Sequence, residues 1–334
     1  MHALRELGVG DAVRNGGFVP TSGEMRRPDG TVLRRFDIAS VRALLDEDTV
    51  CILRPVLHGA LLDAVGLASV DLESPAVGFV THAEGVHVKL ADGRSAEGQV
   101  LVGADGVASV IRSQLHPDER RPWASGLLAI RGVAHDVAPH LGGASGAQYF
   151  GRGFEGGVAR AGEREVYWYL SIKAAHVRGS REPAAVAEQC AAQFHEPFRA
   201  IVRATPSEDL RLDELFERAA ISPWGRGTVT LLGDAAHPML PHAGQGAAQA
   251  LEDAVVLGSS LRGIQDQAGF EAALRRYESV RIPRTRAVVA LARRNARMGS
   301  VDSAAGCWMR DQIIRFIPQA VILKSLVALG KPPR

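Results

Sequence analysis

The stretch Leu231-Leu-Gly-Asp-Ala-Ala-His-Pro-Met-Leu-Pro-His-Ala-Gly-Gln-Gly-Ala-Ala-Gln-Ala-Leu-Glu-Asp-Ala-Val-Val-Leu257 decides the fold. The apolar run 229–232 predicts a short buried strand that delivers Asp234 to its carboxyl end, where open α/β sheets place their ligands. A prolyl loop then leads to Gly244 and Gly246, which open a long helix. Because glycine has no Cβ, a flat ligand can approach the backbone and the N–H groups of the first helical turn. Such a helix start carries about half a positive charge and favours an anion.

Two further stretches have the same kind of chemistry. In Val100-Leu-Val-Gly-Ala-Asp-Gly-Val-Ala-Ser-Val-Ile-Arg112, the pair Asp105-Gly106 ends a predicted strand and starts a predicted helix. Taken alone, Asp-Gly after a strand indicates only a turn. In the segment 54–65, Pro55 occupies a plausible first helical position after Arg54, and the apolar spacing predicts a helix.

Together these stretches resemble the GD and DG motifs and the arginine-led helix of the class A flavin monooxygenases, the group of para-hydroxybenzoate hydroxylase, salicylate hydroxylase and zeaxanthin epoxidase. The resemblance implies that Asp234 binds the flavin ribityl hydroxyls and that the Pro241 loop lies beside flavin C4a. It implies that Asp105 serves both FAD and the pyridine nucleotide, and that the helix start favours the anionic reduced flavin. The cofactor-binding residues that it implies are Arg54, Val77, Asp105, Asp234, Pro241, Gly244, Gln245, Gly246, Ala247 and Ala248.

The activity implied by the resemblance is that of a monooxygenase. NADH or NADPH reduces FAD, and one oxygen atom of O₂ is inserted into an aromatic or other electron-rich small molecule. Because the cofactor supplies the difficult chemistry, no dedicated catalytic acid or base is expected. In Val166-Tyr-Trp-Tyr-Leu170, a predicted strand, Tyr167 is a possible substrate-pocket residue, and core packing of these aromatic residues is an equal alternative.

The chain departs from the family pattern at its start. The family opens with a βαβ unit whose G-x-G-x-x-G loop holds the FAD diphosphate. Met1–Gly8 resembles the helix that follows this unit, so we expect the chain to lack the first βαβ unit and to bind FAD weakly as written. Gly151-Arg-Gly-Phe-Glu-Gly156 matches the pattern, but extended runs follow it, so we interpret it as a loop of the substrate-binding part.

Two other function classes stay open at this stage. The first is a truncated flavin-fold remnant without redox activity that acts as a small-molecule or partner-binding protein. The second is a reductase or halogenase, since these enzymes share parts of the same motifs. The hydroxylase is the preferred hypothesis because the chain ends soon after its helical tail.

The predicted fold class is α/β, with a Rossmann-like FAD-binding domain that lacks its first βαβ unit. We expect a substrate-binding domain, built on a mainly antiparallel sheet, to be inserted into it, and a helical C-terminal tail to follow. The predicted boundaries are 1–114 and 222–334 for the FAD-binding domain and 115–221 for the substrate-binding domain. Turn residues at 28–30 between short extended runs predict a hairpin near the N-terminus.

Composition excludes several partners and sites. The chain has 39 basic and 37 acidic residues, and its formal charge of +2 argues against nucleic-acid binding. The three cysteines lack the paired spacing of disulfide frameworks or zinc sites, so we predict no metal site, reduced thiols and a cytoplasmic location. The apolar segment 316–329 is shorter than the ~20 residues that span a bilayer, so we expect it to pack on the protein without stable membrane association. We expect a monomer or homodimer.

Overall fold

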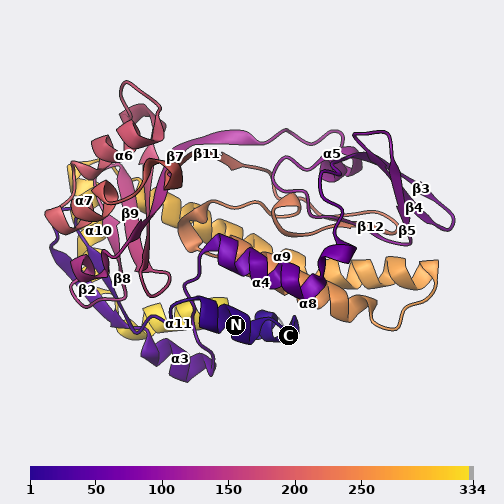
Figure 1. Cartoon of the computed structure of the whole chain (residues 1–334), viewed down its shortest axis with the longest axis horizontal. Helices are drawn as coiled ribbons and strands as arrows, with labels where there is room; N and C mark the ends of the chain where they lie inside the picture. The colour runs from indigo at the N-terminus through magenta and orange to yellow at the C-terminus, as the bar shows by residue number, and fades with distance from the viewer. Residues whose placement is uncertain (331–334) are drawn as a thin grey trace. The chain divides into compact units, whose positions relative to one another are not determined.

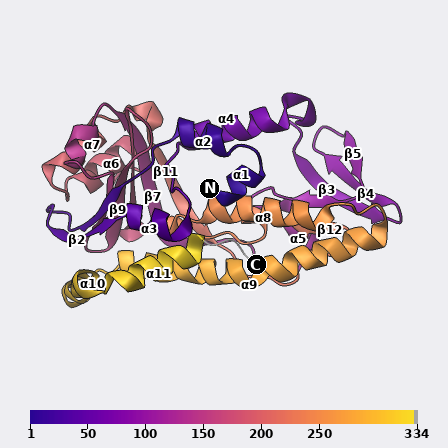
Figure 2. The same ribbon diagram turned by 90° about the horizontal axis from the view of Figure 1, so that it is seen from below.

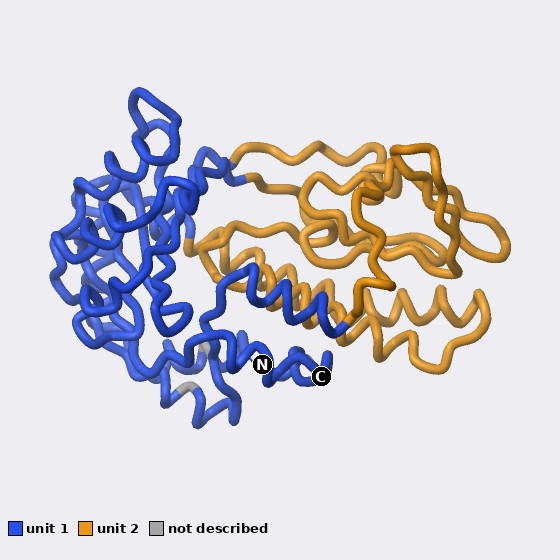
Figure 3. The backbone as a smooth tube through the Cα atoms, viewed as in Figure 1, with its two compact units in different colours: residues 1–64, 125–215, 296–331 blue, residues 65–124, 216–295, 332–334 orange. Residues whose placement is uncertain are grey.

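The computed structural model describes residues 1–330, with the side chains of residues 41, 325 and 326 left aside. Contacts between residues divide the chain into two compact units, coloured blue and orange in Figure 3. Unit 1 comprises residues 1–64, 125–215 and those from 296 onward, and unit 2 comprises residues 65–124 and 216–295. The predicted functional boundaries at 114 and 222 stay predictions, and the predicted end of the FAD-binding part at residue 334 lies outside the described residues.

Unit 1 is built on a mixed sheet of seven strands in the order β11-β7-β10-β9-β8-β1-β2. The pairs β1–β2, β8–β9, β9–β10 and β10–β7 are antiparallel, whereas β1 and β8 run parallel. The strands are β1 (Ser22–Arg26), β2 (Val32–Asp37), β7 (Trp123–His135), β8 (Gly146–Phe150), β9 (Phe154–Arg160), β10 (Glu165–Lys173) and β11 (Arg211–Glu217). The mainly antiparallel sheet that the sequence predicts is therefore present, and the N-terminal hairpin forms part of it.

The turns of this sheet follow the local sequence. The predicted hairpin at 28–30 is confirmed: Asp29 Oδ1 accepts a hydrogen bond of 2.8 Å from the Thr31 N–H, and Gly30 has a φ of +89° that favours glycine. The G-x-G-x-x-G match at Gly151–Gly156 falls on the tight connection between β8 and β9 and continues into β9. Its interpretation as a loop without a following helix is thus confirmed.

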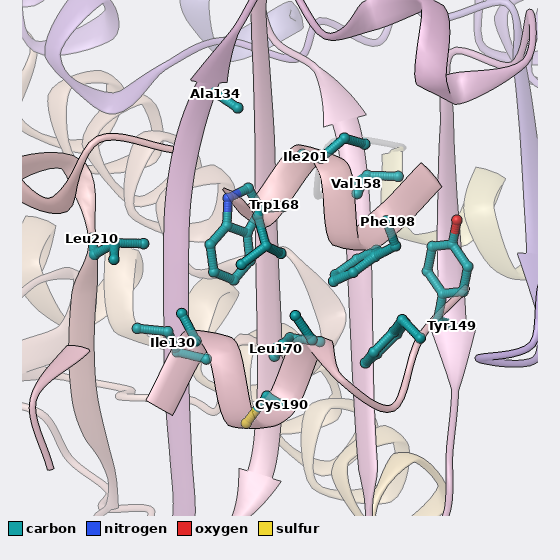
Figure 4. Close-up of a cluster of buried hydrophobic side chains, with 14 of the residues drawn as sticks. Ile130, Ala134, Tyr149, Val158, Trp168, Leu170, Cys190, Phe198, Ile201 and Leu210 are labelled. Carbon is teal, nitrogen blue, oxygen red and sulfur yellow. The ribbon is translucent and has the colours of Figure 1, made fainter. Parts of the chain in front are cut away.

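One face of the sheet forms the main core of unit 1. Val166, Trp168, Leu170 and Ile172 alternate along β10 and are all buried on this face. Helices α6 and α7 cover the face with their own apolar side chains, among them Phe198 (Figure 4). The fully buried Trp168 also donates a hydrogen bond of 2.8 Å from Nε1 to Thr205 Oγ1, which satisfies its only polar group.

Of the helices of unit 1, α6, α7 and α10 lie beside the sheet, whereas α4 extends away from it (Figures 1 and 2). Their bounds are α1 (His2–Glu6), α2 (Gly10–Gly16), α3 (Ala39–Leu45), α4 (Arg54–Val65), α6 (Pro183–Ala191), α7 (Glu196–Arg203), α10 (Ala304–Phe316) and α11 (Gln319–Gly330). The predicted helical C-terminal tail is formed by α10 and α11, between which the chain bends by 91°. Pro318 stands at the bend, and the residue before a proline is biased away from helical geometry.

Unit 2 contains two small sheets and two long helices. Its elements are β3 (Ala76–His82), β4 (Gly85–Leu90), β5 (Ser95–Gly98), β6 (Leu101–Gly103), α5 (Val110–Leu115), β12 (Val229–Leu231), α8 (Gly246–Leu261) and α9, which runs Gln267–Gly299 and ends in unit 1. β3, β4 and β5 form an antiparallel sheet, and β6 pairs with β12 in parallel. A second apolar core that includes Leu231, Trp224 and Tyr277 lies within this unit.

A helix that crosses a bilayer needs about 20 mostly apolar residues. Within the described residues no single helix is long and apolar enough to cross a membrane, although the bent pair α10–α11 meets the length and composition test when its helices are joined.

We predict that Trp168→Ala destabilises the chain by about 3–5 kcal/mol, because it removes a fully buried ring and leaves a cavity under α7. Denaturant unfolding followed by circular dichroism measures the change. The matched control is Trp308→Ala, since Trp308 is 63% exposed and should change the free energy of unfolding by less than about 0.5 kcal/mol. Equal losses in the two variants would contradict this assignment of the core.

Candidate functional site

The two principal motifs follow neighbouring parallel strands in unit 2. In the register of the pair, Leu231 of β12 stands beside Gly103 of β6. The Leu232 N–H continues the ladder with a 2.9 Å hydrogen bond to the Gly103 carbonyl. Since parallel strands end at the same sheet edge, the loops that begin at Asp105 and at Asp234 are brought together there. The two loops are therefore far apart in the sequence but close together in the structure.

The loop after β12 is exposed above a buried base. Gly233 has a φ of +60°, Asp234 is exposed, and the next three residues, 235–237, are buried. Gly244 also has a φ of +60° and nothing lies within 4 Å of the Cβ that another residue would carry. Helix α8 then starts at Gly246 without a side-chain cap. This arrangement leaves room for a flat ligand beside the loop and presents uncapped N–H groups suited to an anion.

Asp253 of α8 holds the start of this loop. Its fully buried carboxylate accepts a 3.0 Å hydrogen bond from the Gly233 N–H, and the same oxygen lies 2.6 Å from His237 Nε2. The other oxygen accepts a 2.6 Å hydrogen bond from Arg281 Nε. Because a carboxylate only accepts, His237 donates through Nε2. One side chain thus fixes both ends of the segment 233–237 that carries Asp234.

A buried charge network extends from Asp253 and ties α8 to α9. Arg281 is fully buried and its Nη1 lies 2.6 Å from Glu252 Oε2. Arg284, one turn further along α9, also donates to Glu252 at 2.6 Å. Gln249 accepts from Arg281 through its backbone carbonyl and through its side-chain oxygen. Since each buried cation has a carboxylate partner, the network avoids the cost of an unpaired charge.

Arg112 connects the two motifs directly. It belongs to α5, is fully buried, and donates from Nη1 to the carbonyl oxygens of Ala235 and Ala236 at 2.9 and 3.0 Å. Its Nε and Nη2 form a two-point ion pair with Glu119 at 2.8 and 2.5 Å. The loop after β12 is therefore held both by Asp253 and by Arg112.

The carboxylate of Asp105 accepts hydrogen bonds from residues at the start of α5. Its Oδ1 accepts from Ser109 Oγ at 2.5 Å, and its Oδ2 accepts from the N–H groups of Val110 and Ile111 at 2.8 and 3.2 Å. These bonds satisfy donors at the start of α5, as an N-terminal cap does. Cofactor binding by Asp105 stays a prediction, and it would use lone pairs that remain beside these contacts.

The other predicted residues divide between the units. Asp105, Asp234, Pro241 and the segment 244–248 lie in unit 2, where the exposed Val77 lies on β3. Arg54, the exposed first residue of α4, and Tyr167 on β10 belong to unit 1. Beside Pro241, burial lowers the pKa of His242 to about 4, so this imidazole is uncharged at neutral pH.

Tyr167 lies on the face of the unit 1 sheet opposite the Trp168 core. Tyr167 and Tyr169 stack with ring centroids 6.3 Å apart, and Tyr169 packs over Gly157 of the neighbouring strand. Burial raises the pKa of both tyrosine hydroxyls. The buried Glu155 occupies the same face, and burial raises its pKa to about 8. This face thus combines aromatic rings with a carboxyl group that keeps its proton near neutral pH.

Sequence reasoning assigned no role to Asp253, His237 or Arg281. A usable signal existed for Asp253, because Glu252-Asp253 interrupts an otherwise apolar stretch of a predicted buried helix, and buried charges need partners. Nothing in the sequence pointed to Arg281 as the partner, since it is one of many arginines on α9.

The comparisons with known proteins identify the family. The model of the FAD binding domain family matches residues 1–292. A relative from Stigmatella aurantiaca, an aurachin C monooxygenase/isomerase, is 35% identical over 95% of this chain and 82% of its own length. The chain belongs to the class A flavin monooxygenases.

Further relatives and solved structures are similar to this monooxygenase over most of its length. The 2-heptyl-3-hydroxy-4(1H)-quinolone synthase of Pseudomonas aeruginosa is 30% identical over 80% of this chain and 69% of its own length. Among solved structures, Klebsiella pneumoniae HpxO complexed with FAD and uric acid aligns with a TM-score of 0.90 and 26% identity, covering 99% of this chain and 86% of that one. A salicylate hydroxylase substrate complex, at 19% identity and a TM-score of 0.77, shows the same fold.

The monooxygenase is therefore FAD-dependent and uses NADH or NADPH with O₂. The redox-inactive alternative loses its support, because the relatives are enzymes of this class. Among the described residues no cluster of three or more potential metal ligands occurs.

We predict that Asp253→Asn lowers the free energy of unfolding by about 3 kcal/mol, because it removes one carboxylate from the fully buried Arg281. Denaturant titration measures the loss. Glu271→Gln, an exposed acid on α9, is the matched control and should be neutral within about 0.5 kcal/mol. A neutral Asp253→Asn would show that the backbone alone holds the loop.

We predict that Glu155 makes stability fall as pH rises. Its folded pKa of about 8 lies above the value of 4.5 expected when unfolded, so the folded state binds an extra proton between these pH values. Its stabilising contribution is full below pH 4.5 and is lost as pH rises through 8. Between pH 5.5 and pH 8 the free energy of unfolding of the wild type should fall by roughly 3 kcal/mol more than that of Glu155→Gln, as measured by denaturant unfolding. Glu163→Gln, on an exposed turn, should keep the wild-type slope.

Proposed function

We propose that the exposed loop after β12 holds FAD in this monooxygenase. The observation that carries the proposal is the juxtaposition of this loop with the Asp105 loop at one sheet edge, held by Arg112 and Asp253. The residues fit the group: Asp234 is exposed for hydroxyl contacts, Gly244 leaves open space for a ring, and the start of α8 is uncapped. Pro241, Gln245, Gly246, Ala247 and Ala248 complete this surface, and Arg54 and Val77 are proposed as further FAD contacts.

The bound FAD supplies electron transfer from NAD(P)H and the activation of O₂. The chain supplies position and electrostatics. The N-terminus of α8 would stabilise negative charge on a bound flavin ring, and the neutral His242 adds no charge beside Pro241. Because buried ion pairs fix the loop before the ligand arrives, little ordering is required on binding.

We further propose that the substrate is a neutral heteroaromatic ring with an alkyl chain, such as a 2-alkyl-4(1H)-quinolone. The name of the Pseudomonas relative gives a product of this type. On the Tyr167 face, the cations of β7 and β10 are already paired: Arg131 lies 2.6 Å from Asp213, and Lys173 pairs with Asp302. Paired cations favour a neutral ring over a benzoate, and the tyrosine rings offer stacking and hydroxyl groups.

The remaining assignments follow the sequence prediction. Residues 1–114 and 222–334 are proposed to serve FAD, although 331–334 lie outside the described residues, and 115–221 to serve the substrate, with Tyr167 in the pocket. We propose a cytoplasmic monomer or homodimer without nucleic-acid partners. The weak FAD binding expected of the chain as written stays a prediction, and measured flavin retention by the chain tests it.

The test is an absorbance scan of the purified chain after addition of FAD and gel filtration, followed by NADH and NADPH oxidation assays. We predict that Asp234→Ala weakens FAD binding by about tenfold or more, because a charged hydrogen-bonding group is lost. Product analysis should show oxygen insertion into 2-heptyl-4(1H)-quinolone and little reaction with 3-amino-4-hydroxybenzoate.

Glu271→Ala is the control and should bind FAD as the wild type does. Unchanged FAD affinity in Asp234→Ala would overturn the assigned flavin site. Faster turnover of the benzoate than of the quinolone would overturn the substrate class while leaving the flavin site intact.

A further inference from the structure

Helix α10 exposes four large apolar side chains and buries two of its three charged ones. Trp308, Met309, Ile313 and Phe316 are 63, 56, 56 and 78% exposed, whereas Arg310 and Asp311 are buried. We call these four residues the α10 apolar face. At 100° per residue they occupy one side of the helix, and Arg310, Asp311 and Ile314 occupy the other. A surface helix of a protein surrounded only by water shows the reverse pattern.

Hydrogen bonds fix this orientation. Arg310 donates to the carbonyl oxygens of Gly151 and Phe150 at 2.8 and 3.1 Å, and its guanidinium lies over the Phe150 ring. Asp311 Oδ2 accepts from Arg27 Nε at 2.7 Å. Rotating the helix to bury Trp308 would break these buried polar contacts, which is costly. The α10 apolar face is therefore held outward by unit 1 itself.

The exposed charged side chains of α10 and α11 themselves are both basic. Among residues 303–330 the exposed charged side chains are Arg315 and Lys324, and the single acid, Asp311, is buried. Aromatic side chains beside exposed cations are typical of helices that lie in the interface of an anionic bilayer. Val321 of α11, 47% exposed, adds to the apolar area beyond the bend.

A second copy of the chain fits this surface less well. In a two-fold contact the same patch faces itself, so Arg315 and Lys324 would meet only cations from residues 303–330 of the other copy. Phosphate headgroups supply the missing negative charge, and neither α10 nor α11 is long enough to span. Contact in the plane of the membrane surface satisfies both the apolar and the charged groups.

We propose that the α10 apolar face docks the enzyme reversibly onto an anionic membrane surface. This contact is peripheral and needs no spanning segment. Its use rests on the proposed function: an alkylated ring partitions into lipid, and an enzyme held at the surface meets it there. Docking itself does not depend on which substrate is bound.

The experiment measures binding of the full chain to sedimented vesicles of phosphatidylglycerol and phosphatidylcholine, and to vesicles of phosphatidylcholine alone. We expect binding to the anionic vesicles, with a blue shift in tryptophan emission that is absent in Trp308→Phe. The double variant Trp308→Ser/Phe316→Ser should lower the partition coefficient by about tenfold or more. Arg315→Gln/Lys324→Gln should lower it at low salt and remove most of its salt dependence.

The matched control is Leu67→Ser/Leu72→Ser, which changes two leucines that are each 68% exposed in unit 2. It should bind vesicles as the wild type does. Equal binding by the Trp308/Phe316 variant and the wild type would overturn the proposal, as would no vesicle binding. A dimer that the double variant converts to a monomer, without vesicle binding, would assign the face to a second copy.

Two activity measurements separate this proposal from the substrate proposal. With a soluble short-chain quinolone in vesicle-free buffer, the double variant should match the wild type. With 2-heptyl-4(1H)-quinolone supplied in anionic vesicles, its rate should fall several-fold. No turnover of either quinolone by the wild type would reject the substrate class, while vesicle binding would still decide the docking proposal.

Discussion

The parallel pairing of β6 with β12 is the constraint on which the loops of unit 2 depend. Gly103 and Leu231 stand side by side, so two loops more than a hundred residues apart begin at one sheet edge. The backbone ladder sets this register, and the burial of Leu231 and Val229 stabilises it. A slip by one residue would turn every side chain of the strand to the other face and displace both loops.

Buried charges make the exposed loop rigid. Asp253 and Arg112 both form hydrogen bonds to the segment after β12, and each is itself part of an ion pair within the unit. Such ion pairs add little net stability compared with apolar residues of the same shape, since desolvation offsets much of their attraction. Their value lies in geometry: a carboxylate with three defined donors has one orientation, and the loop after β12 is held accordingly.

The sheet of unit 1 uses its two faces differently. One face is closed by α6 and α7 around Trp168, and the other carries Tyr167, Tyr169 and Glu155. Strand alternation produces this division, because successive side chains of β10 point to opposite faces. The same unit holds α10 with its apolar side outward. Because the hydrogen bonds of Arg310 and Asp311 hold one side of α10 against the unit, its apolar side is left exposed.

The sequence by itself determined the strand–loop–helix motifs, the hairpin at 28–30, the rejected glycine pattern and the family, since each rests on residues close in the chain. Backbone requirements of glycine, proline and aspartate act over a few residues and leave readable patterns. Only the tertiary structure decided that Asp253 pairs with Arg281, that Arg112 reaches Ala235, and that Trp308 points outward. Many arginines of this chain could pair with a given carboxylate, and the choice depends on which helices pack together. The bend at Pro318 shows the same limit, because the apolar run continues through a position where the backbone turns.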